Sequence, residues 1–162
     1  MYIRVAFRLH VMQKDINYTW FFRQPPSVVW DYLTVPELLA EWLMANDFKP
    51  LVGHKFRFTS NPKVKFGFDG IVYCEVLEVE PLKRLSYSWK GGPGNGKITL
   101  DSVVTWTLTA KDGGTELQLE HTGFGGFKNY FAYLMMNNGW GGGIRKRLTA
   151  LLAGIKNETT AS

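Results

Sequence analysis

FKNYFAYLMMNNGWGGGIRKRLTALLAGI, residues 127–155, is the one long segment of this chain with a helical pattern, and the rest of the fold has to form around it. Apolar side chains recur in it at three- and four-residue intervals, the period of a helix with one buried face. Each glycine inside a helix costs about 1 kcal/mol relative to alanine, so Gly141-Gly142-Gly143 predicts a bend or a very close neighbour there. The stripe predicted to face the interior is Tyr130, Leu134, Asn137, Gly141, Ile144, Leu148, Leu151 and Ile155.

The residues before this helix have the alternating pattern of half-buried strands. A first strand carries Ile16, Tyr18, Trp20 and Phe22, and Pro25-Pro26 ends it. Short turn sequences such as Glu80-Pro81 separate the later strands, which forces neighbouring strands to be antiparallel. The later strand patterns are Phe56/Phe58, residues 66–79, Leu85/Tyr87/Trp89, Ile98/Leu100/Val104/Trp106/Leu108 and Leu117/Leu119/His121.

Two short helices are predicted directly after the first strand. Ser27 is expected to cap the first of them, and Pro36 marks the beginning of the second. The predicted fold class is therefore α+β, with a curved antiparallel sheet wrapped around the long C-terminal helix. A sheet bent around a single helix leaves a concave apolar space, which is where small molecules bind.

Length and composition indicate one domain. A chain of 162 residues buries about two-thirds of its unfolded-chain surface, and the aromatic content of 15% supplies rigid side chains that line a cavity without collapsing it. We expect the domain to span residues 15–156, with a disordered tail at 157–162. Residues 1–14 are an extension, either an extra strand or sequence upstream of a start at Met12; the second interpretation is favoured because the strong pattern begins at Asp15.

The net charge of +5 leaves nucleic acid and anionic membranes open as partners. The cations are scattered, however, and the Arg145-Lys146-Arg147 cluster is expected to interact with the carbonyl end of the helix dipole. We therefore predict no nucleic-acid partner and no stable membrane association; no segment approaches the ~20 apolar residues that span a bilayer. Cys74 is the single cysteine, which excludes an internal disulfide and favours a reducing, cytoplasmic location.

Several chemical motifs are weak. GGPGNGK at residues 91–97 has the spacing of a phosphate-binding loop, but Ile98 replaces the required Ser or Thr and a strand pattern follows, so a hairpin loop is predicted. His10, His54, His121 and Cys74 lie far apart in sequence, so no metal or other cofactor is predicted. No serine has a nucleophile-elbow sequence around it, and no catalytic residue is assigned.

The candidate ligand pocket lies between the sheet and the helix. Strand alternation turns His121 toward the helix, where it is either a core histidine bonded to a backbone carbonyl or an orienting, proton-handling group. Asn137 raises the same question, because a buried amide needs partners. These side chains form either a pocket wall or an ordinary core. The predicted pocket residues are Phe56, Phe58, Tyr87, Trp89, Trp106, His121, Tyr130, Leu134, Met136, Asn137 and Trp140.

The order of several short segments carries a family resemblance. The segments are PPSVVW (25–30), PELLAEW (36–42), VGHKFRF (52–58), FDG (68–70), EVLEVEP (75–81), RLSYSW (84–89), TELQLEHTGF (115–124) and GW (139–140). In this order they resemble the START-like (SRPBCC) superfamily, and within it the bacterial proteins similar to the C-terminal domain of the activator of the heat-shock protein 90 ATPase.

The resemblance implies a helix-grip fold with a deep hydrophobic cavity. Relatives bind lipids, sterols and polyketides, and some are cyclases or hydrolases. The expected function is therefore binding of a small hydrophobic ligand, lipid-like or aromatic. One alternative is a chaperone ATPase activator or stress-response interaction module, although we expect this single domain to lack the second domain of the eukaryotic activator. The other alternative is an enzyme that uses His121, Tyr87 or Asn137. A monomer or weak dimer is expected.

Overall fold

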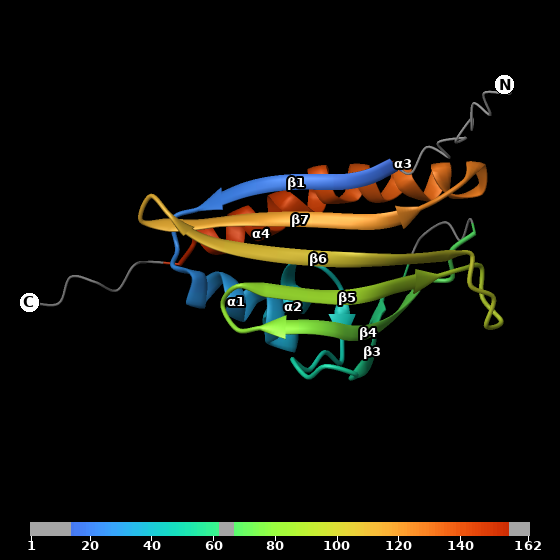
Figure 1. Ribbon diagram of the computed structural model, residues 1–162, viewed down its shortest axis with the longest axis horizontal. Helices are drawn as coiled ribbons and strands as arrows, with labels where there is room; N and C mark the ends of the chain where they lie inside the picture. Colours follow the sequence, from blue (N-terminus) through green and yellow to red (C-terminus); the bar gives the residue numbers. More distant parts are fainter. Residues whose placement is uncertain (1–13, 62–66, 156–162) are drawn as a thin grey trace, which may run out of the picture.

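Residues 14–61 and 67–155 are described by the computed structural model (Figure 1). Seven strands form one antiparallel sheet in the order β1-β7-β6-β5-β4-β3-β2. They are β1 (Lys14–Phe22), β2 (Ala45–Asn46), β3 (Lys55–Thr59), β4 (Ile71–Glu80), β5 (Arg84–Gly91), β6 (Leu100–Lys111) and β7 (Gly114–Phe124). The long C-terminal helical segment lies along one side of this sheet, as Figure 1 shows. The predicted α+β helix-grip fold is confirmed.

The two short helices follow β1 as predicted. They are α1 (Pro26–Thr34) and α2 (Pro36–Trp42), separated by Val35. The expectation that Ser27 caps α1 is wrong, because the helix begins at Pro26 and no side chain caps it. Proline at the first helical position has no N–H to satisfy, which removes part of the need for a cap.

The C-terminal helix is built in four pieces. A 3-10 turn (Phe127–Asn129) leads into α3 (Tyr130–Gly139), which continues through a π-helical turn (Trp140–Ile144) into α4 (Arg145–Ala153). Gly142 leaves helical geometry at φ −109° and ψ −109°. Beside it, a methyl group on Gly141 would lie 2.5 Å from the hydroxyl oxygen of Tyr18. The glycines therefore provide both of the features expected, a bend and a very close neighbour.

The π-helical turn changes which face of the helix is buried. After the turn the predicted stripe holds, since Leu148 is buried and Leu151 and Ile155 pack against the core. Before the turn it is wrong, because Tyr130 and Leu134 are 45% and 40% exposed. The π-helical turn inserts an additional residue, so a constant period of 3.6 loses its phase there. The side chains of α3 that pack inward are Ala132, Tyr133 and Met136.

The strands begin later than predicted at two places. Ile98 precedes β6 and is 43% exposed, and Phe68 lies before β4. The two-residue strand β2 was not predicted, because so short a segment shows no alternation. The predicted extension at residues 1–14 lies outside the described residues except for Lys14, which begins β1; the predicted tail at 157–162 and Phe66 also lie outside them.

Aromatic rings pack against one another between the sheet, α2 and the π-helical turn. Trp106 lies edge-on to Trp140 and to Trp42, with ring centroids 5.5 and 5.8 Å apart. Phe58 contacts Trp89 with centroids 5.3 Å apart, and all five of these rings are buried. Such tilted and edge-to-face pairs each add about 0.5–1.5 kcal/mol to the burial of the rings. This half of the interior is a solid core.

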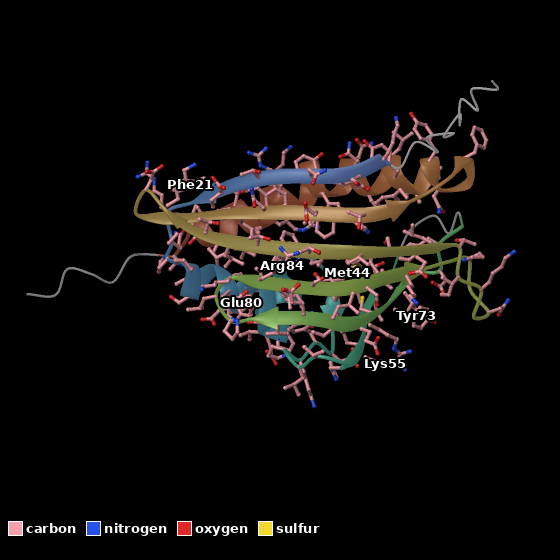
Figure 2. The ribbon with its side chains drawn as sticks, in the orientation of Figure 1. Phe21, Met44, Lys55, Tyr73, Glu80 and Arg84 are labelled. Carbon is pink, nitrogen blue, oxygen red and sulfur yellow. The ribbon has the colours of Figure 1, made fainter. Side chains whose placement is uncertain are left out.

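The outer face of the sheet carries charged side chains of both signs. Figure 2 labels Lys55, Glu80 and Arg84 on strands β3, β4 and β5. Arg84 Nε lies 2.9 Å from the Glu78 carboxylate, and both side chains are about half exposed. An exposed pair of this kind contributes about 0–1 kcal/mol. In the described part of the chain, no helix is long and apolar enough to cross a membrane.

The glycine-rich segment between β5 and β6 is a hairpin loop, as predicted. The Lys97 amide donates to the Gly94 carbonyl at 3.2 Å, and Asn95 adopts a left-handed conformation with φ 56°. The strand that follows, rather than a helix, leaves no row of N-terminal amides for a phosphate.

Candidate functional site

A cavity of about 400 Å³ lies between α3 and the end of the sheet that carries the β5–β6 loop. The wall is apolar in most places, and none of its described side chains is charged. Cavities of this size and character are typical of small-molecule sites. The lining residues are Met44, Gly67, Phe68, Val72, Trp89, Gly91, Gly92, Thr99, Leu100, Asn129, Phe131, Ala132, Met135, Met136, Gly139 and Ile144.

Small residues keep this space open. Gly91 and Gly92 form the wall on the sheet side, and Ala132 and Gly139 form part of the wall on α3. A side chain at Gly91 would meet the Phe68 ring at 3.4 Å, and one at Gly139 would meet Ile144 at 3.6 Å. A larger residue at Gly91, Ala132 or Gly139 would reduce the volume of the cavity. Gly92 is required for a different reason, because a side chain there would collide with the carbonyl oxygen of Lys97.

The back of the cavity is held by a relay of three hydrogen bonds. Trp140 Nε1 donates to His121 Nδ1 at 3.1 Å. Since Nδ1 accepts, the proton of the neutral imidazole lies on Nε2, which is 2.8 Å from Ser102 Oγ. Ser102 Oγ in turn donates to the Trp89 carbonyl at 2.7 Å. The relay therefore runs from the helix through two strands to Trp89, whose ring forms part of the cavity wall.

His121 is a core residue. It is fully buried and does not line the cavity. Burial lowers its pKa to about 3, so the imidazole is neutral at physiological pH. His121 therefore occupies the position of a core histidine. Its hydrogen-bond partners are the side chains of Ser102 and Trp140, and not the backbone carbonyl that was expected. Both ring nitrogens of His121 are hydrogen-bonded to side chains, and His121 is not among the residues that line the cavity.

A second buried pair lies deeper in the core. Trp106 Nε1 donates to the Tyr87 hydroxyl at 3.0 Å. Phe56 lies edge-on to Tyr87 with centroids 5.4 Å apart. Burial raises the pKa of the Tyr87 hydroxyl, so this group stays protonated. These three residues are buried and do not line the cavity.

The eleven predicted pocket residues fall into three groups. Trp89 and Met136 line the cavity. Phe56, Phe58, Tyr87, Trp106, His121 and Trp140 are buried in the core behind it. Tyr130 and Leu134 are on the exposed face of α3, and Asn137 accepts a hydrogen bond from the Tyr18 hydroxyl at 2.8 Å. The amide of Asn137 is therefore satisfied by a strand and not by a ligand.

Sequence reasoning missed most of the cavity wall. Phe131 and Met135 lie beside the predicted stripe and not in it, and Met44 and Phe68 lie in irregular segments that show no period. The available signal was the Gly141-Gly142-Gly143 run. A π-helical turn there shifts the inward face of the preceding helix by one residue, from Leu134 to Tyr133 and Met136.

Two other features of the molecule do not have the properties of a ligand or reactive site. A hollow of about 440 Å³ at the β6–β7 hairpin is lined by Phe21, Arg23, Asp112 and Gly113 alone, which is too little apolar wall to bury a ligand. Cys74 is buried, and burial raises the pKa of its thiol. Among the residues described, no three His, Cys, Asp or Glu side chains gather as a metal site would require.

The family follows from a match over most of the chain. The family model described as Activator of Hsp90 ATPase homolog 1-like protein matches residues 23–153, which include every element from α1 to α4. The chain belongs to this family. No protein of curated function matches the sequence.

Several solved structures have the same fold as this protein. Protein MLL2253 from Mesorhizobium loti is 38% identical, with a TM-score of 0.77 over 88% of this chain and 99% of that one. CalU16 from Micromonospora echinospora is 22% identical (TM-score 0.68, 88% and 78% covered). The Aha1 dimer from Colwellia psychrerythraea is 17% identical (TM-score 0.65, 91% and 99% covered). The last two likenesses concern the fold alone.

Proposed function

We propose that this protein reversibly binds a small apolar molecule in the cavity between α3 and the β5–β6 loop. The observation that carries the proposal is an apolar space of about 400 Å³ set beside a solidly packed core. Protein interiors are normally close-packed, so a cavity of this size needs a reason. The small residues Gly91, Ala132 and Gly139 give that reason, because they leave the space open.

The cavity sets the size of the ligand. At about 30 Å³ for each water-sized group, roughly thirteen such groups fit into about 400 Å³. Thirteen buried carbon groups contribute about 10 kcal/mol at about 0.8 kcal/mol each, and association costs at least about 4 kcal/mol. The difference corresponds to dissociation constants of about tens of micromolar. A bicyclic aromatic or a medium-length acyl chain has the right size.

A probe titration tests this function. The probe is N-phenyl-1-naphthylamine, an apolar fluorophore whose emission rises on transfer from water. The test variant is Ala132→Phe, which fills the cavity from α3; the matched control is Ala150→Phe, which places the same ring on the exposed side of α4. We expect Ala132→Phe to weaken probe binding by about tenfold or more and Ala150→Phe to leave it unchanged.

Two results would overturn the proposal. One is a wild-type protein that shows no saturable binding of the probe. The other is an Ala132→Phe variant that folds normally, by its thermal unfolding transition, and binds the probe as tightly as the control. Native mass spectrometry after incubation with a bacterial lipid extract then identifies the natural ligand by its mass.

Stimulation of a chaperone ATPase is a second candidate function, and the description of the matched family favours it. The test is the ATPase rate of a purified bacterial chaperone of the heat-shock protein 90 class with and without this protein. An increase that Ala132→Phe leaves unchanged would assign the activity to the outer surface and separate it from the cavity. No increase at saturating protein would remove this candidate.

A further inference from the structure

The outward face of the segment from Phe127 through α3 is made of large exposed apolar side chains. Their exposed fractions are 96% for Phe127, 45% for Tyr130, 56% for Phe131, 40% for Leu134 and 56% for Met135. Their spacing of three and four residues places them on one face of the helix. A contiguous apolar face of this kind is unusual on a protein surface and marks an interaction site.

This face is continuous with the mouth of the cavity. Phe131 and Met135 belong to both, since each is more than half exposed and each lines the cavity. These two side chains therefore separate the interior of the cavity from whatever covers α3. A partner that contacted the outward face would also contact the cavity mouth.

The charge along the same helix has one sign. Residues 121–155 contain no Asp or Glu. Arg145 and Lys146 are exposed on α4, which continues the line of α3 along the sheet (Figure 1). The Lys14 ammonium lies 4.8 Å from the centre of the Tyr130 ring, at the edge of the apolar face. In the described part of the chain, the ion pairs lie on strands β4 to β7 and their connecting turns, and none involves α3 or α4.

We propose that α3 docks reversibly on the surface of a lipid bilayer that contains anionic phospholipids. An apolar helix face flanked by cations is the composition of helices that lie in the membrane interface. Phe127, Phe131 and Leu134 enter the boundary between headgroups and acyl chains, while Lys14, Arg145 and Lys146 interact with lipid phosphates. Each cation near such a surface contributes about 1 kcal/mol. The helix lies on the membrane and does not span it.

Docking gives the apolar ligand a route that avoids water. With α3 on the bilayer, the Phe131 and Met135 side chains at the cavity mouth face the acyl chains, and the ligand moves between bilayer and cavity past them. This transfer step rests on the proposed binding function. The docking step does not rest on it, because association with vesicles is measurable when the cavity is empty.

A second copy of this chain is a less suitable occupant of the same face. A symmetric dimer brings the same patch of both chains together. Residues 121–155 of the second copy would supply no carboxylate for Arg145 or Lys146, so in this segment the cations would meet only neutral or cationic groups. Anionic phospholipid supplies the missing negative charge together with an apolar phase.

Vesicle flotation tests the docking. The protein is mixed with phosphatidylcholine vesicles, or with vesicles in which about one third of the lipid is phosphatidylglycerol. We expect the wild-type protein to float with the anionic vesicles, and high salt to release most of it. The bound fraction is expected to fall about tenfold or more for Phe127→Ser combined with Leu134→Gln, and for Arg145→Glu combined with Lys146→Glu.

Matched controls separate the face from general effects. Leu51→Ser with Val52→Ser removes two apolar side chains that are 62% and 67% exposed elsewhere on the molecule. Lys49→Glu with Lys55→Glu makes the same change of net charge at exposed positions away from α3 and α4. Both controls are expected to float like the wild type. Neither test variant alters a cavity-lining residue, so both should bind the fluorophore normally without vesicles.

Three outcomes overturn the docking proposal. The first is a wild-type protein that stays with neither kind of vesicle. The second is a set of control variants that lose binding as strongly as the test variants. The third is a concentration-dependent dimer in sedimentation equilibrium that Phe127→Ser with Leu134→Gln abolishes, in a protein that does not float; this would assign the face to a second copy. A failure of fluorophore binding alone would leave docking intact and remove the proposed ligand function.

Discussion

Trp140 donates its indole N–H to Nδ1 of His121 at 3.1 Å, and this bond fastens the C-terminal helix to strand β7. Both residues are fully buried. The bond fixes the tautomer of His121, which in turn orients Ser102 toward the carbonyl of Trp89. The cavity wall at Trp89 is thereby connected to the helix that covers it.

Replacing Trp140 should cost more than replacing another buried tryptophan. Trp140→Phe leaves His121 Nδ1 buried without a donor, in addition to the lost packing. Trp20→Phe is the matched control, because Trp20 Nε1 is itself buried and makes no hydrogen bond in the described structure. We expect Trp140→Phe to lower the free energy of unfolding in urea by about 1–3 kcal/mol more than Trp20→Phe. Equal losses would mean that the bond to His121 contributes nothing.

The burial of His121 predicts a dependence of stability on pH. Its folded-state pKa of about 3 lies below the ordinary value of 6.5. Between these two values the unfolded chain binds a proton that the folded chain does not, so lowering the pH favours unfolding. Above about pH 6.5 this group does not lower the free energy of unfolding. As the pH falls from there toward 3, the free energy of unfolding decreases by about 1.4 kcal/mol per pH unit.

His121→Gln isolates this contribution from those of the carboxylates. The variant keeps an acceptor and a donor at the site but does not titrate. Urea unfolding of both proteins from pH 7 to pH 4 should show a shallower loss of stability with falling pH for the variant than for the wild type. Identical slopes would show that His121 has the same pKa in the folded and unfolded states, which would contradict the lowered pKa.

Gly141 is predicted to be intolerant of a side chain. A methyl group there would lie 2.5 Å from the Tyr18 hydroxyl oxygen, so Gly141→Ala is expected to destabilise the fold by about 1–3 kcal/mol. Gly143→Ala is the control, since its methyl group would meet only the flexible end of Arg147 at 3.3 Å. Adding Tyr18→Phe to Gly141→Ala should recover part of the loss, and a purely additive double variant would refute the steric explanation.

Cys74 reports on the opening of strand β4 and its neighbours. It is buried, and burial raises the pKa of its thiol, so the reactive thiolate is scarce in the folded protein. A thiol reagent such as 5,5′-dithiobis(2-nitrobenzoic acid) should modify it rapidly in urea and slowly in buffer. Modification in buffer at the rate of a free thiol would show that the strands around Cys74 open readily.

Much of the fold could be predicted because its signals are local. The alternation of Ile16, Tyr18, Trp20 and Phe22 predicts β1, and short turns predict antiparallel neighbours. The π-helical turn could not be placed from period alone. Its glycines permit several conformations, and the close approach of Tyr18, a residue distant in sequence, selects one of them.

The cavity was harder to predict than the fold. The large aromatic residues that suggested a pocket wall, such as Tyr87 and Trp106, instead pack against one another, since ring contacts are favourable and fill space. The space remains where side chains are small, at Gly91, Ala132 and Gly139. Absent side chains give no periodic signal in a sequence, whereas aromatic residues give a strong one.

Methionine methyl NMR offers the most direct test of the ligand cavity. Met44, Met135 and Met136 line it from two sides, so their ¹³C-methyl signals report on its occupancy. Titration with N-phenyl-1-naphthylamine should shift all three signals along one saturation curve, and Ala132→Phe should abolish the shifts. Signals that stay in place while the probe binds elsewhere, or that shift equally in Ala132→Phe, would contradict a binding site between α3 and the sheet.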